Sequence, residues 1–335
     1  MKKLLLLLLS VSAISLASKA QDTVKTTNDS PLVIWGSVDA YYKYDFSGHA
    51  NIPTSFATDQ NSFSIGMLDL GIKKKVGKAS FVGEISFGPR GQSQSIPVVG
   101  GESYHIQNLN VSYDVTDNFS LAGGYFGTFI GYEVISPVGN FNYSTSYLFT
   151  NGPFQNAGVK ATFTFSPAAS LMVGVFNDDW NVYTATSKIN TFGAQLMLAP
   201  VKGWTAYLNV LSGPASGTIL DLTTAYQITD AFKLGLNAAN KTGNGLPNYK
   251  GIALYPNLTV AKGVALGLRG EYFKWSAAGS EATTAVTFTA NIKSGPLTFI
   301  PEVRLDNNKS APFTDKNLAA SKSASQFLLA AVYAF

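Results

Sequence analysis

Charged side chains of both signs lie two residues apart within otherwise apolar segments of the sequence. Arg269 and Glu271 have this spacing in GVALGLRGEYFKW (263–275), and Glu302 and Arg304 have it in PLTFIPEVRLD (296–306). Residues two apart in a β-strand point to the same face, so each pair lies opposite the Val, Leu and Phe side chains of its segment. Such a face can hold water, ions and polar solutes. If Arg269 instead faced lipid at mid-strand, the exposure would cost about 2 to 4 kcal/mol.

The same alternation, followed through the chain, predicts a polar interior that a barrel would use to line a pore. Because both signs of charge are present, we expect weak ion selectivity. For Lys43 and Arg304 the alternative is that the long side chain reaches the interface from a strand end. The side chains predicted to line the pore are Asp39, Lys43, Glu84, Lys160, Asp221, Asn237, Arg269, Glu271, Glu302 and Arg304.

The elements that must position these side chains are β-strands. Segments of about ten alternating residues are typical of membrane-spanning barrels. We therefore predict an all-β, antiparallel transmembrane outer-membrane β-barrel of about 16 strands, with 14 to 18 compatible with the pattern. The predicted strands are 33–46, 61–74, 79–88, 103–114, 118–127, 154–165, 169–178, 189–199, 203–211, 217–227, 231–240, 249–260, 263–275, 282–293, 296–306 and 324–335.

The connections between these segments alternate in length. Every second one is short: Val76-Gly77, Thr116-Asp117, Pro167-Ala168, Lys202, Thr229-Asp230, Ala261-Lys262 and Ser294-Gly295. The others include longer loops at 47–60, 89–102, 128–153, 179–188 and 307–323. This asymmetry is typical of outer-membrane barrels, whose short turns are periplasmic, and an even strand count would leave both termini in the periplasm. A secreted β-sandwich would explain the strands but not this asymmetry.

Composition agrees with a lipid environment. Only 13% of the residues are charged, about half the share in soluble domains. Beyond the N-terminus no apolar run has the length of a spanning helix. No basic stripe predicts nucleic-acid binding. Aromatic residues that gather at strand ends, as expected for interfacial girdles, are Trp35, Tyr42, Tyr44, Phe46, Tyr113, Trp204, Tyr272, Phe273 and Trp275.

The N-terminus has the pattern of a secretory leader. Lys2 and Lys3 precede an apolar run, and Ser18-Lys19-Ala20 offers small residues before a cleavage point. We predict a signal peptide at 1–20, a short periplasmic segment at 21–32 and the barrel at 33–335. The exported chain has no cysteine and therefore no disulfides.

The C-terminus, FLLAAVYAF (327–335), alternates to the last residue and predicts a closing strand whose edge pairs with the first strand. Phe327, Leu329, Tyr333 and Phe335 also resemble the C-terminal signal that outer-membrane barrels present to the bacterial insertion machinery. That resemblance implies the insertion machinery as a partner.

Enzymatic and metal-binding patterns are weak. Ser103 and His105 lie two residues apart and would share one face of a strand. The sequence offers no third group to orient them, as a hydrolase would need. Asn177-Asp178-Asp179 lacks the further spaced acids of a calcium loop. No zinc spacing or phosphate-binding loop occurs. We expect no catalytic residue, no cofactor and no bound metal.

Three short motifs resemble the β-barrel porin family described as OmpL-like, from the outer membrane of Gram-negative bacteria. They are Asp39-Ala40-Tyr41-Tyr42, Gly131-Tyr132-Glu133, and Asn151-Gly152-Pro153-Phe154 with Gly158. The resemblance implies a porin that lets small hydrophilic solutes diffuse passively, with outer-membrane lipid around it. A non-conducting barrel acting as adhesin or scaffold stays open, and an outer-membrane enzyme is a weaker alternative. A homo-oligomer also stays open.

The longest connection, 128–153, is hereafter the third loop. General diffusion porins fold a loop at this position into the channel, and the aromatic, charge-poor content of the third loop suits a packed interior. We predict a constriction formed by Glu133, Asn140, Asn142 and Tyr143. A surface loop that shields the barrel mouth or contacts a partner is the equally weighted alternative.

Overall fold

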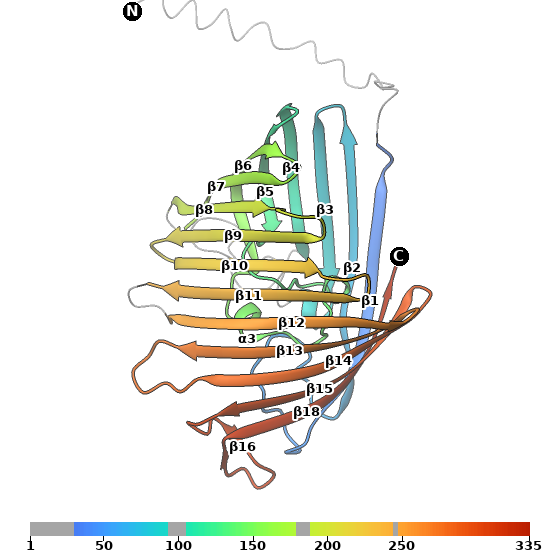
Figure 1. The fold of residues 1–335 in the computed structure, drawn as a ribbon, viewed down its shortest axis with the longest axis vertical. Coiled ribbons are helices and arrows are strands. Elements are labelled where there is room, and N and C mark those ends of the chain that lie inside the picture. Colours follow the sequence, from blue (N-terminus) through green and yellow to red (C-terminus); the bar gives the residue numbers. More distant parts are fainter. Residues whose placement is uncertain (1–29, 93–104, 179–187, 244–246) are drawn as a thin grey trace, which may run out of the picture.

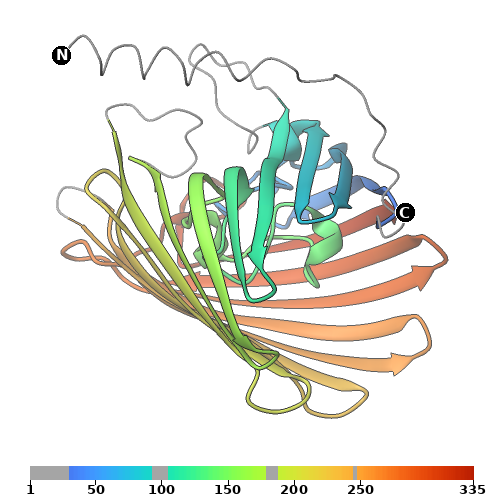
Figure 2. The ribbon, with the colours of Figure 1, turned by 90° about the horizontal axis from the view of Figure 1, so that it is seen from above.

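The computed structural model describes residues 30–92, 105–178, 188–243 and 247–335. Sixteen antiparallel strands close into one barrel, in which the first strand pairs with the last (Figures 1 and 2). All sixteen predicted strands are confirmed, with ends that differ by at most three residues. They are β1 Val33–Asp45, β2 Ser62–Val76, β3 Ala79–Phe87, β4 Ile106–Thr116, β5 Phe119–Gly127, β6 Gln155–Ser166, β7 Ala169–Asn177, β8 Ile189–Leu198, β9 Trp204–Gly213, β10 Gly217–Gln227, β11 Phe232–Thr242, β12 Tyr249–Ala261, β13 Val264–Trp275, β14 Thr283–Ser294, β15 Leu297–Asn308 and β18 Ser323–Ala334.

The two faces of the barrel wall follow the alternation of the sequence. In β14, Val286 and Phe288 are about half exposed on the outer surface, whereas Thr287 and Thr289 between them are fully buried inside. Successive strand residues point to opposite faces, so one register decides the environment of a whole strand. Apolar residues thus form the outer surface, and polar residues face inward.

Tight hairpins join the strands at one end of the barrel, and the longer loops lie at the other. Gly263 and Gly295 occupy two of the hairpins with φ of 76° and 60°. This left-handed conformation suits glycine because it has no Cβ. β1 begins and β18 ends at the hairpin end, so the two ends of the barrel chain lie together there.

The last long loop contains structure that the sequence pattern did not predict. β16 (Phe313–Thr314) and β17 (Ala320–Ser321) pair as a small separate hairpin. Phe313 is buried against Ile52 and Ala324. The side chain of Asn51 exchanges hydrogen bonds with the backbone of Thr314. Each strand is only two residues long and is too short to show a period, so only these contacts define it.

The closing seam joins Phe335 to Gly36 of β1. Their backbones exchange hydrogen bonds of 3.0 and 3.2 Å. The Phe335 ring covers Gly36, where a Cβ would lie 2.7 Å from the ring. The absence of a side chain at Gly36 therefore leaves space for the Phe335 ring at the seam.

The barrel interior contains the third loop, including the one-turn helix η1 (Pro137–Gly139) and the short helix α3 (Tyr147–Thr150). Figure 2 shows this segment, in green, within the ring of strands. A further short helix, α2 (Pro89–Gln92), lies beside β2 and β3. Within the described ranges, no helix is both long and apolar enough to cross a membrane. The predicted leader, 1–20, lies outside the described residues.

Candidate functional site

The third loop is held inside the barrel by strand side chains that bond to its backbone. A backbone hydrogen bond from Thr128 N to Phe154 O, 2.9 Å long, closes its base. The backbone N–H and C=O groups of a buried loop need hydrogen-bond partners, because an unpaired buried polar group is destabilising. The inward charges of the strands supply those partners.

Arg269 of β13 forms the centre of these contacts. Its guanidinium is fully buried and lies 2.9 Å from the Glu133 carboxylate of the loop and 2.7 Å from Glu271 of its own strand. It also donates to the carbonyl oxygens of Ser144 and Thr145. The second Glu133 oxygen accepts a 2.7 Å hydrogen bond from the N–H of Ser146. One buried ion pair thus fixes both arms of the loop.

Arg304 of β15 makes a parallel set of contacts one hairpin away. Its Nε donates to Asp306 at 2.7 Å, and its Nη1 donates to the Thr145 carbonyl at 2.8 Å. Asp306 also accepts a 2.6 Å hydrogen bond from the Tyr147 hydroxyl, and the N–H of Tyr147 donates to Glu271. These contacts anchor the start of α3 to the wall.

A β-bulge between β1 and β2 contacts Tyr143 of the third loop. The pairing of β1 with β2 shifts between Val38 and Ala40, and the Asp39 carboxylate there accepts a 3.0 Å hydrogen bond from the N–H of Met67. The Tyr143 hydroxyl donates to the same carboxylate. Gly66 leaves space for both groups, because a Cβ there would overlap the Asp39 carboxylate. The bulge is therefore part of the loop-binding surface.

The start of the third loop is bonded to a different part of the wall. Asp221 of β10 accepts a 3.0 Å hydrogen bond from the N–H of Gly131. The amides of Asn209 and Asn237, on the two neighbouring strands, donate to the same carboxylate at 2.7 and 2.6 Å. Because β1 and β10 lie on well-separated parts of the ring, the loop reaches across the interior.

Aromatic and apolar loop side chains lie over glycines on the inner wall. Leu148 packs on Gly251 of β12, where a Cβ would lie 2.8 Å from the Leu148 Cδ2. Tyr132 lies over Gly235 in the same way, and its ring stacks on Tyr255 with centroids 4.5 Å apart. Because these glycines have no side chains, the loop can pack closely against the backbone of the wall.

Two cavities remain beside the loop, toward the hairpin end. One of about 560 Å³ lies against β6 and β8 to β10 and is lined by Lys160, Gln195, Tyr207 and Thr223. The other, of about 570 Å³, extends to β14 and includes Lys233 in its lining. The two cavities share three lining residues: Tyr132, Glu133 and Ala225. The first turn of the third loop therefore separates two polar spaces.

The ten predicted pore-lining side chains lie on the inner face of the wall. Eight of them are buried: Asp39, Lys43, Asp221, Asn237, Arg269, Glu271, Glu302 and Arg304. Lys43 Nζ donates to the Thr58 carbonyl at 3.0 Å. Glu84 accepts a hydrogen bond from Asn108, and Lys160 Nζ lies 4.0 Å from the Phe126 ring centroid.

The four residues predicted for the constriction differ in their contacts. Glu133 is ion-paired and buried. The Asn142 amide donates to Thr289 at 2.6 Å, and the N–H of Tyr143 donates to Glu302 at 3.1 Å. Asn140 instead bonds to the backbone of Val134 within the loop. Three of the four therefore contact the wall or its charges.

Among the site residues that the sequence analysis did not name are the charged groups of Asp306 and Arg90. Asp306 lies two residues after Arg304 in the same strand, so the alternation places both side chains on the same face and could have indicated Asp306. Arg90 of α2 is buried and donates to the Ile135 carbonyl at 2.6 Å, with its guanidinium 4.4 Å from the Phe56 ring centroid. It lies outside every strand, so no periodic signal indicates it.

The remaining sequence candidates lie elsewhere. The His105 ring stacks on Phe87, with centroids 4.5 Å apart, at the start of β4. Ser103 and Asp179 lie outside the described residues. Among the described residues, no group of three or more His, Asp or Glu is placed to hold a metal ion. Phe327, Leu329 and Tyr333 lie on the outer face of β18, and Phe335 follows its last residue. Leu329, Tyr333 and Phe335 are exposed.

Three expected girdle residues, Trp35, Phe273 and Trp275, are corrected by the structure because they lie on the inner face. Trp35 shares the face of Ser37 and Asp39 in β1, and the Trp275 ring lies 5.9 Å from that of the buried Tyr249. Phe273 is buried inside the barrel, where its ring lies 5.7 Å from that of Tyr147. It shares the parity of Arg269 and Glu271, which fixes its face. Tyr272, one residue earlier, lies on the outer surface and is 40% exposed.

Burial also affects two phenols of the third loop. The pKa of the Tyr143 hydroxyl is raised by its removal from water and further by the Asp39 carboxylate beside it. The pKa of Tyr147 is raised by burial and by Asp306. Both phenols therefore stay protonated and can donate over the whole physiological pH range.

Comparison with known structures shows a porin-type sixteen-strand barrel. An anion-selective porin from Comamonas acidovorans superposes with a TM-score of 0.63 at 13% identity, over 92% of this chain and 100% of that one. OmpF of Salmonella typhi, in a complex with daunomycin, gives 0.61 at 8% identity over 92% and 100%. OmpT of Vibrio cholerae gives 0.57 at 14% identity over 91% and 97%. At such identities the likeness shows the fold alone.

The chain belongs to the family described as "Putative beta-barrel porin-2, OmpL-like", whose model matches residues 31–335. The family confirms the resemblance drawn from the short motifs, and it implies an outer-membrane location. Comparison with curated proteins finds no match.

Proposed function

We propose that the protein is a non-enzymatic diffusion channel for small hydrophilic solutes, narrowed by the third loop. Its leader, residues 1–20, is removed on export. The long loops then face the exterior, and both termini lie in the periplasm. The observation that carries the proposal is the packing of the third loop inside a sixteen-strand barrel, which is wide enough for an aqueous channel.

The polar spaces beside the loop support a hydrated path. The larger cavity is lined by polar side chains, among them Asn140, Asn257 and Asn291. The buried arginines are matched by carboxylates. Glu133 lines both cavities, with Lys160 in one and Lys233 in the other, and this mixture of charges favours weak ion selectivity and separation of solutes by size.

A closed barrel is the second candidate, and one observation favours it. The third loop is bonded to Asp39 on β1 and to Asp221 on β10, so it spans the interior between separated strands. A loop held at both ends could block the lumen. The barrel would then act through its outer loops or conduct only after the loop moves.

Single-channel recording separates these candidates. We would compare the refolded chain with a variant lacking residues 134–150 in a planar bilayer. Discrete current steps that grow in the variant would support an open pore with the third loop as its constriction. Silence in the full chain with steps in the variant would indicate a blocked or gated channel. Silence in both, from protein shown to be folded, would contradict channel function.

A further inference from the structure

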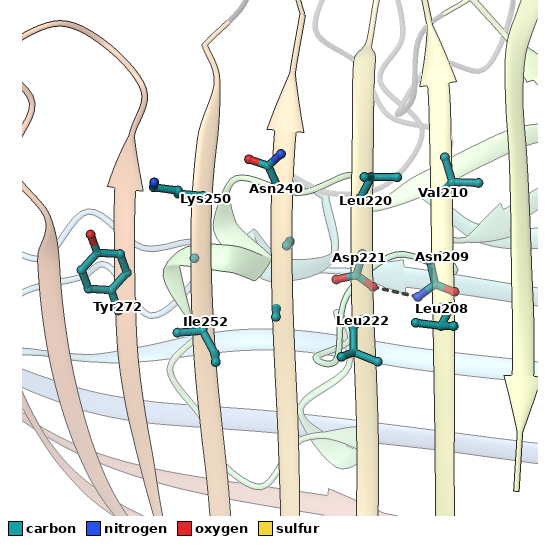
Figure 3. Close-up of a pocket in the computed structure, with 13 residues that line it drawn as sticks. Leu208, Asn209, Val210, Leu220, Asp221, Leu222, Asn240, Lys250, Ile252 and Tyr272 are labelled. Carbon is teal, nitrogen blue, oxygen red and sulfur yellow. Dashed lines mark hydrogen bonds between the residues drawn. The ribbon is translucent and has the colours of Figure 1, made fainter. Parts of the chain in front are cut away.

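The outer surface of β9 to β13 contains a groove of about 680 Å³ (Figure 3). Leu208, Leu222, Ala238, Ile252 and Tyr272 form one row across these five strands by their pairing register. Ala238 has the shortest side chain and lies between Leu222 and Ile252, so the surface is lowest there. The row lies on the outer surface of the barrel, and its floor is apolar.

In the next row, one step nearer the long loops, β9 and β10 contribute Val210 and Leu220, and β11 to β13 contribute polar residues, hereafter the polar row. Asn240 pairs with Lys250, and Lys250 pairs with Lys274. Lys250 is exposed, and Lys274 lies two residues beyond the exposed Tyr272 on the same face. No carboxylate of the described residues forms a salt bridge with either lysine. Two like charges directly opposite each other across a strand pair are destabilising unless an anion lies between them.

We propose that this outer groove binds a membrane lipid with an anionic phosphate headgroup. The phosphate lies between the ammonium groups of Lys250 and Lys274, where the amide of Asn240 can also donate. One acyl chain lies along the groove over Ala238. Each lysine offers three donors and a full charge, and basic residues at a membrane surface attract anionic lipid headgroups.

The charge of the polar row disfavours a second copy of the chain as the occupant. A two-fold interface over this groove would bring the same surface together from both copies, with four lysines facing one another. Like-charge contacts across an interface oppose association. A lipid phosphate neutralises the same lysines. The lipid site does not depend on whether the barrel conducts.

The binding test uses the full chain in a neutral detergent and measures retained lipid by native mass spectrometry. The probe is dimyristoyl phosphatidic acid, and the comparison lipid is dimyristoyl phosphatidylcholine, which has the same acyl chains without net charge. We expect one molecule of the acid to be retained at concentrations where the choline lipid is lost. Equal retention of both lipids would overturn the proposed phosphate site.

Two variants separate the headgroup from the groove. Lys250→Gln with Lys274→Gln is expected to weaken binding of the acid roughly tenfold or more. The control carries Lys202→Gln and Lys262→Gln at the hairpin end, with the same change in charge. Ala238→Trp fills the groove and is expected to reduce binding with both lysines intact. Unchanged binding in the double lysine variant, or a dimer that excludes lipid, would contradict the proposal.

Discussion

Glu133 and Arg269 lie 136 residues apart in the chain, and their side chains form a 2.9 Å ion pair inside the barrel. The pair joins the third loop to β13, and Glu133 is also bonded to the N–H of Ser146 across the loop. Glu133 is therefore one of the buried carboxylates that hold the loop in the lumen, and it connects two parts of the loop to the same arginine.

Glu133→Gln tests this role, because it keeps the shape of the side chain and removes the charge. We expect the free energy of unfolding in urea to fall by about 1.5 to 3 kcal/mol, the contribution of hydrogen bonds to charged groups. Lys75→Gln is the control, since Lys75 and Asp114 form an exposed ion pair of 2.6 Å. Exposed pairs contribute about 0 to 1 kcal/mol. Equal losses in the two variants would contradict a special role for Glu133.

Gly251→Ala tests whether the third loop packs on the inner wall because Gly251 has no side chain. The added Cβ would lie 2.8 Å from Leu148 and 2.9 Å from the Tyr272 carbonyl oxygen. Overpacking of this kind costs about 1 to 3 kcal/mol, so we expect a less stable barrel. Gly270→Ala, on the neighbouring strand, is the matched control because no heavy atom lies within 4 Å of its built Cβ. Stability measured by urea unfolding should fall only in the first variant.

The wall could be predicted from the sequence because its period is fixed. Arg269 and Arg304 had to share a face with Glu271 and Glu302, and a one-residue slip would have put all four in lipid. The same rule places Phe273 inside, against the initial expectation of a girdle residue. The position of a residue in the alternation therefore predicted its face better than its residue type did.

The contacts of the third loop could not be predicted in this way. The hydrogen bond from Tyr143 to Asp39 joins positions more than a hundred residues apart and depends on a bulge at Gly66. Neither the bulge nor the burial of Arg90 leaves a periodic trace. Loop partners are defined by the closed barrel, and the sequence reveals only that the loop is aromatic and poor in charge.

Tyr143→Phe predicts a change in the pH dependence of stability. Burial and Asp39 raise the pKa of Tyr143 above its ordinary value of 10.0. The neutral phenol is favoured in the folded state, so its stabilisation is complete below pH 10 and is lost as the pH rises further. We expect unfolding measured between about pH 8 and 11 to show a smaller alkaline loss in the variant. Identical pH profiles would indicate that Tyr143 is exposed to water.

Lys160→Glu tests whether solutes pass through the cavity of about 560 Å³ beside β6 and β8 to β10. Lys160 lines that cavity and contacts the Phe126 ring without a salt bridge among the described residues. Reversing its charge should shift the reversal potential in a KCl gradient toward cation preference. Lys202→Glu, in a hairpin outside the cavity, should leave the potential unchanged. No shift in Lys160→Glu, with current present, would place the path elsewhere.

Deletion of Phe335 separates recognition by the insertion machinery from closure of the seam. The last residue bonds to Gly36 through its backbone and covers it with its ring. If the C-terminal residues are also a recognition signal, assembled protein in the outer membrane should fall severalfold, while refolding in detergent changes much less. Phe299→Ala, which removes an outward aromatic ring from β15, is the control for lost lipid contact. Equal losses in cells and in detergent would assign Phe335 to barrel stability alone.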